Sequence, residues 1–69
     1  MICVFPIINS ALDEGLITVE TIADMLEESE SKVANKLCGN DKFDINEAMT
    51  ININLFPDVP FKELFSKKG

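Results

Sequence analysis

The segment from Asp41 to Glu47 combines carboxylate and amide side chains of the kind that bind metal ions. A calcium-binding EF-hand loop needs oxygen ligands at its first, third and fifth positions and a glycine at the sixth. Counted from Asp41, the third position is Phe43, and counted from Asp44, the sixth is Met49. Neither register fits, so the segment predicts no site of this type.

Catalytic side chains in a productive spacing are equally hard to find. The 69 residues include no His, so the commonest general base and metal ligand is missing. Cys3 and Cys38 form no CxxC motif, and no glycine-rich phosphate loop is present. We therefore expect that the protein is not an enzyme and needs no metal or other cofactor.

The net charge of −6 is unevenly spread along the chain. Residues 1–31 hold seven acids and no base, whereas residues 32–69 hold all six lysines and five acids. Nucleic-acid binders are usually basic, because phosphate neutralisation supplies most of their affinity. The whole chain fails this test, although its second half can meet it locally. The apolar start is too short for a signal core or a membrane span, which favours a cytoplasmic protein with reduced thiols.

Helix start and stop signals divide the chain into five short helices in a single all-α domain spanning residues 1–69. Side chains that cap helices, glycines that end them and prolines that start or stop them set the boundaries. The expected helices run from Pro6 to Gly15, from the N-cap Thr18 through Leu26, from the N-cap Ser29 to Gly39, from the Asp44–Glu47 capping box to just before Pro57, and from Asp58 through Phe65.

The second and third expected helices have the spacing of a helix-turn-helix. Ala23 is small enough to let two helices cross closely, and Leu26 and Val33 are placed to fill the angle between them. Ser29 starts the second helix a few residues after the first one ends. In such a unit the second helix can enter the major groove of DNA.

This stretch resembles the helix-turn-helix of phage Cro and repressor proteins, and the second half resembles small regulators of Gram-positive prophages. The resemblance covers about residues 7–66 and implies a compact five-helix lambda-repressor-like domain with its helix-turn-helix at about residues 18–37. Val19, Glu27 and Cys38 depart from the family pattern; Glu27 replaces a glycine at the turn, where a left-handed non-glycine residue costs about 1 kcal/mol or more. The matching positions are Thr18, Ala23, Leu26, Ser29, Val33 and Gly39, then residues 41–48, 55–58 and 64–65.

The resemblance implies a DNA-binding transcriptional regulator, such as a repressor that binds double-stranded operator DNA as a dimer. In the family, the outer face of the third helix contacts bases, and its end and the following loop contact phosphates. Asn can read adenine, and Glu can accept a hydrogen bond from cytosine. Carried onto this chain, the base-facing candidates are Glu30, Ser31 and Asn35, and the phosphate-facing candidates are Lys32, Lys36, Asn40 and Lys42.

Two questions stay open at the level of sequence. The acidic cluster of Glu27, Glu28 and Glu30 has three interpretations: a solvated turn, a placement of Glu30 that stabilises the dipole of the third helix, or part of an acidic surface that binds a basic regulator protein, as an antirepressor would. The apolar segment from Met1 to Ile8 either packs over the core or forms a homodimer contact, by strand pairing or by helix packing.

Overall fold

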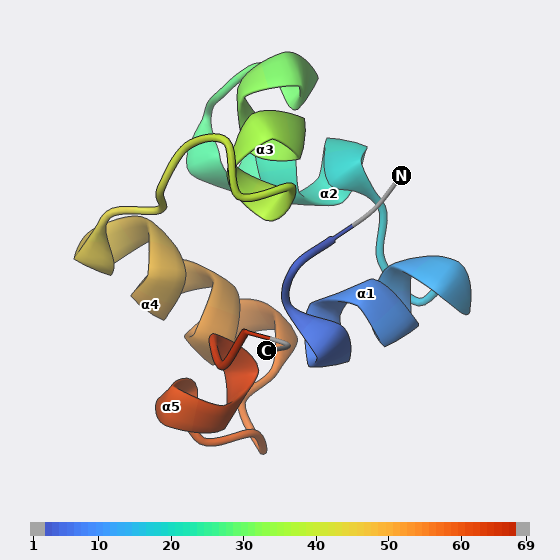
Figure 1. Ribbon diagram of the computed structural model, residues 1–69, viewed down its shortest axis with the longest axis vertical. Coiled ribbons are helices and arrows are strands. Elements are labelled where there is room, and N and C mark those ends of the chain that lie inside the picture. Colours follow the sequence, from blue (N-terminus) through green and yellow to red (C-terminus); the bar gives the residue numbers. More distant parts are fainter. Residues whose placement is uncertain (1–2, 68–69) are drawn as a thin grey trace.

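Five helices form the architecture of residues 3–67, which is the part of the chain that the computed structural model describes (Figure 1). No strand occurs within those residues, so the all-α prediction is confirmed and each predicted helix is present. The helices are α1 (Pro6–Asp13), α2 (Val19–Leu26), α3 (Glu30–Leu37), α4 (Ile45–Leu55) and α5 (Phe61–Leu64).

Side chains just ahead of three helices set where those helices begin. Thr18 and Ser29 each accept a hydrogen bond from the backbone N–H three residues later, as the N-cap prediction required. At α4, the Asp44 carboxylate accepts from the N–H of Glu47 at 2.8 Å, and the Glu47 carboxylate accepts from the N–H of Asp44 at 3.0 Å. The predicted capping box is therefore confirmed.

Three residues in the left-handed conformation lie where helices end. Gly15 has φ +75° and Gly39 has φ +87°, values that glycine adopts without a side-chain penalty. Glu27, with φ +57°, ends α2 in the same conformation, although it carries a Cβ atom. The sharp turn into α3 is therefore made at a cost of about 1–2 kcal/mol in backbone strain.

We predict that Glu27→Gly stabilises the protein by about 1 kcal/mol, because it relieves this strain. Urea unfolding followed by far-UV circular dichroism measures the change. Glu30→Gly is the matched control: Glu30 is also an exposed acid, but it lies in the first turn of α3. There the glycine is expected to lower stability by about 0.5–1 kcal/mol. A loss of stability in both variants would contradict the strained turn.

The hydrophobic core receives at least one fully buried side chain from every helix. Beside this core, the ring of Phe65 packs against the rings of Phe5 and Phe43, with centroid distances of 5.5 and 6.0 Å. Both contacts have the edge-to-face geometry that aromatic pairs prefer. The helices α2 and α3 form the most extensive helix pair. The fully buried residues are Ile8, Ile22, Val33, Leu37, Ile51 and Leu64.

The N-terminal segment belongs to this core over its described residues. Cys3, Phe5 and Ile8 are buried, and the N–H of Val4 donates to the carbonyl of Leu37 at 2.9 Å. That bond satisfies a carbonyl at the end of α3, which lacks a partner within its own helix. Cys3, Phe5 and Ile8 therefore pack into the core, as the first of the two open interpretations expects, and Met1 and Ile2 lie outside the described residues.

Candidate interaction surface

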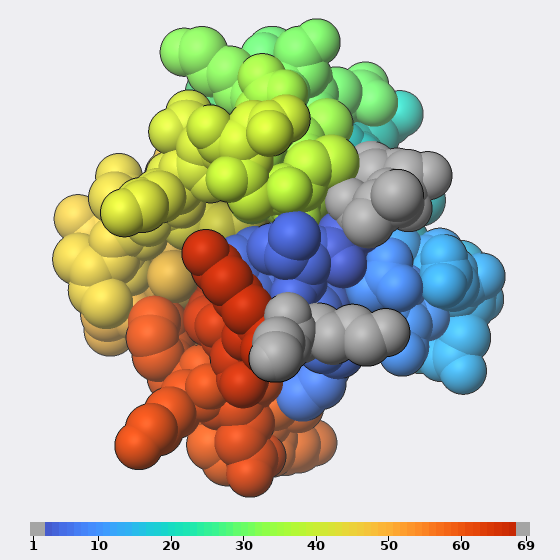
Figure 2. Space-filling model, in the orientation of Figure 1, coloured from blue at the N-terminus to red at the C-terminus, as the bar shows by residue number. Residues whose placement is uncertain are grey.

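The outer face of α3 carries most of the residues that the sequence analysis singled out. Six of the seven are exposed there or in the loop that follows: Glu30, Ser31, Lys32, Asn35, Asn40 and Lys42. The α2–turn–α3 unit lies at one end of the molecule, with its green surface open to solvent in Figure 2. The seventh residue, Lys36, is only 8% exposed.

Lys36 is held in a network with two carboxylates. Its Nζ donates to both carboxylate oxygens of Glu28 at 2.9 Å, and to those of Glu47 at 2.9 and 2.8 Å. The ring of Phe43 lies beside it, with its centroid 6.0 Å from Nζ. Because Glu28 lies in the turn before α3 and Glu47 in the first turn of α4, one ammonium group connects two segments of the fold.

The expectation that Lys36 lies on the exposed face of α3 is therefore wrong. Residues three apart are neighbours on a helix surface, so Lys36 lies beside Val33, which is fully buried. This places Lys36 on the side of α3 that faces α4. The sequence did contain one signal for this inward position, because Lys36 follows the apolar Val33 by three residues. The pairing itself was missed because Glu47 is eleven residues further along the chain.

Burial and hydrogen bonding to charged partners shift the pKa values of Lys36 and Glu47 in opposite directions. Burial by itself would lower the pKa of the Lys36 ammonium, but its hydrogen bonds to Glu28 and Glu47 outweigh burial and raise that pKa. Burial would likewise raise the pKa of Glu47. The hydrogen-bonded network with Glu28 and Lys36, and the N–H of Asp44, instead lower the pKa of Glu47 to about 2. Lys36 and Glu47 are thus both charged at neutral pH.

We predict that stability falls as the pH drops from about 4.5 towards 2, on account of Glu47. A carboxyl group with a lowered pKa in the folded state stabilises the protein above its ordinary pKa of 4.5, and this contribution disappears on protonation. The loss is on the order of 2 kcal/mol. Urea unfolding between pH 7 and pH 2 measures it. Glu47→Gln keeps a capping side chain but cannot ionise, so its stability should vary less over that window. Parallel pH curves for the two proteins would contradict the role of Glu47.

We predict that Lys36→Met lowers the free energy of unfolding by about 2–4 kcal/mol, because it leaves two adjacent, largely covered carboxylates without their cation. Lys32→Met is the control, since Lys32 is exposed on the same helix, and it should change stability by about 0.5 kcal/mol or less. Thermal unfolding of the two variants and the wild type gives the comparison. Equal effects of the two substitutions would show that the network contributes nothing specific.

With Lys36 enclosed, the remaining surface of the α2–turn–α3 unit and its following loop is acidic. Over residues 18–42 the exposed cations are Lys32 and Lys42. The exposed carboxylates there outnumber them, giving a net charge of −3: they belong to Glu20, Asp24, Glu27, Glu30 and Asp41. A surface of this sign repels a phosphate backbone and attracts a basic partner.

Comparisons with protein-family models, with curated proteins and with solved structures found no match to this chain. Within residues 3–67, no three His, Cys, Asp or Glu side chains are grouped as a metal site requires. None of the helices in this part of the chain has the length and apolar character of a membrane span.

Proposed function

We propose that this protein is a small regulator that binds a basic protein through the exposed acids of α2 and the turn into α3. The observation that supports this most is the enclosure of Lys36, which removes one of three lysines from the candidate DNA surface. Glu20, Asp24, Glu27 and Glu30, called here the acidic face, are all exposed. Glu20 and Asp24 are four residues apart on one side of α2, Glu27 ends that helix, and Glu30 begins α3.

The partner that suits this face is a protein with clustered Lys and Arg side chains, such as the DNA-contacting surface of another regulator. An acidic patch attracts a basic partner. Once the Lys and Arg side chains of the partner are covered, they can no longer neutralise DNA phosphates. Together with the resemblance to phage regulators, this favours an antirepressor: a protein that relieves repression by covering a repressor's DNA-binding surface.

A second candidate function is that of the phage or prophage-type DNA-binding repressor itself, with α3 in the major groove. It is favoured by the exposure of Ser31, Lys32 and Asn35 along α3, followed by Asn40 and Lys42 in the loop. In this candidate Asn35 reads a base and the lysines contact phosphates, while Lys36 takes no part.

We predict that a labelled Lys/Arg-rich peptide binds the protein in fluorescence anisotropy titrations, and that binding weakens with salt. The double variant Asp24→Asn and Glu27→Gln should weaken binding by about threefold or more, since each exposed ion pair contributes up to about 1 kcal/mol. Glu63→Gln is the control, because Glu63 is an exposed acid on α5, outside the acidic face, and should bind like the wild type. Equal weakening by both changes would mean that only net charge matters, which would contradict a defined binding face.

The same titration with DNA from the regions flanking the gene separates the two candidates. Binding that survives non-specific competitor at physiological salt would favour the repressor and contradict our proposal. In that case Lys32→Ala should weaken binding to all sequences and reduce the salt dependence by about one unit. An unchanged anisotropy of the labelled DNA, even at low salt, is the result that the antirepressor proposal requires.

A further inference from the structure

Four large apolar side chains are exposed on one side of α4 and α5. Ile45 and Ile53 are each 63% exposed, and Met49 and Phe61 are also open to solvent. Ile45, Met49 and Ile53 are spaced four residues apart, so they form one row along α4, called here the α4 ridge. A groove of about 240 Å³ beside the ridge is lined by Phe61, Asn52 and the ridge itself. An exposed apolar patch of this extent marks an interaction site more often than a single exposed side chain does.

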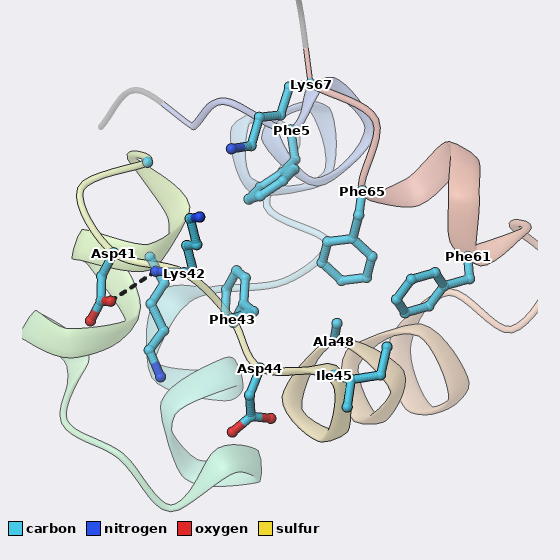
Figure 3. A pocket seen from close by; sticks show the side chains of 12 residues that line it. Phe5, Asp41, Lys42, Phe43, Asp44, Ile45, Ala48, Phe61, Phe65 and Lys67 are labelled. Carbon is cyan, nitrogen blue, oxygen red and sulfur yellow. Dashed lines mark hydrogen bonds between the residues drawn. The ribbon is translucent and has the colours of Figure 1, made fainter.

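The apolar surface continues from one end of the ridge into a larger pocket of about 380 Å³. Ile45 and Phe61 line both hollows, and the rings of Phe43 and Phe65 project into the larger one (Figure 3). The exposed ridge thus joins a partly open cluster of aromatic rings, and a partner placed on α4 covers both.

Along α4 the residues beside the ridge are uncharged, whereas Asp41, Lys42, Asp44 and Lys67 line the larger pocket at one end of it. The one charged residue of α4 is Glu47, whose carboxylate is already paired with Lys36. The polar residues beside the ridge are Asn46, Thr50 and Asn54. They are joined by hydrogen bonds from the Thr50 hydroxyl to the Asn46 carbonyl, and from the Asn54 amide to the Thr50 carbonyl. In a chain with a net charge of −6, this is a face on which two copies can meet with little repulsion.

We propose that the α4 ridge and Phe61 form a homodimer interface in which α4 packs against α4 of a second copy. With a two-fold axis at Met49, Ile45 of one copy lies against Ile53 of the other, so both contacts beside the axis are apolar. Rows of side chains four residues apart pack into each other's grooves when two helices cross at about −50°. A second copy fits this face better than a basic protein does, because the ridge itself offers no carboxylate to a cationic partner. The two acids that line the larger pocket, Asp41 and Asp44, are offset there by Lys42 and Lys67.

The ridge is short, which sets the expected strength of the dimer. An eleven-residue helix is about 16 Å long, so this interface lies at the small end of stable interfaces. We expect a dissociation constant on the order of 10 µM. The acidic face lies on α2 and the turn into α3, so its availability does not depend on α4 pairing.

Sedimentation equilibrium from about 1 µM to about 500 µM, which brackets the expected dissociation constant, tests the proposal. The apparent mass of the wild type should rise from the chain mass of 7.7 kDa towards twice that value. Ile53→Lys should raise the dissociation constant at least tenfold, because it places two like charges in the apolar contact. The exposure of Ile53 lets this variant fold, which circular dichroism checks. Leu16→Lys is the matched control: Leu16 is 72% exposed, lies between α1 and α2, and should leave the dimer intact.

A second measurement tests the position of the two-fold axis. In a Cys38→Ser background, Met49→Cys should give a disulfide-linked dimer in glutathione redox buffer, because the axis brings the two copies of residue 49 together. Leu16→Cys in the same background should stay monomeric on a non-reducing gel. A wild type that stays at 7.7 kDa across the whole range would overturn the proposal. Dissociation by Leu16→Lys but not by Ile53→Lys, or cross-linking at residue 16 but not at residue 49, would also overturn it.

Discussion

The ammonium group of Lys36 is the point on which the arrangement of the helices depends. It bonds to Glu28, which belongs to the turn between α2 and α3, and to Glu47, which belongs to the first turn of α4. Glu47 also closes the capping box that starts α4. One carboxylate therefore takes part both in starting a helix and in connecting that helix to α3. Largely covered charges are costly to leave without partners, so alternative packings that separate these three side chains are disfavoured.

This network also shapes the outer surface of the molecule. It holds Lys36 and Glu28 inside together, so α3 loses one of its two lysines from the surface and the exterior of the α2–turn–α3 unit stays net negative. On α4, the same pairing occupies the single charge of the helix and leaves an uncharged apolar ridge. An acidic region and a neutral apolar region thus occupy different elements of one small domain. Partners of different chemistry can engage them separately.

Much of the fold was predictable because the relevant signals are local. The caps at Thr18, Ser29 and Asp44 act on backbone groups three residues away. The left-handed turn at Glu27 was expected from the resemblance, because a glycine commonly makes this turn in the phage regulators. The burial of Lys36 was not predictable in this way, because it depends on where α4 lies in space.

The exposed row on α4 escaped prediction for another reason. Apolar residues occur nearly all around this helix, so their periodicity does not distinguish the row that carries the buried Ile51 from the row that carries Met49 and Ile53. The functions proposed for the acidic face and the α4 ridge depend on which charged and apolar side chains stay exposed, and tertiary packing decides that.

The contact between Phe5 and Phe65 brings together rings that are sixty positions apart in a chain of 69 residues, with 5.5 Å between their centroids. On the ribosome, sixty residues therefore separate the synthesis of Phe5 from that of the ring that packs against it. Phe5, which is buried in the folded protein, lacks that covering until Phe65 has been made. A core contact between residues so far apart in the sequence slows folding relative to helical proteins with only local contacts. The nascent chain consequently exposes the ring of Phe5 while the sixty residues that follow it are being made.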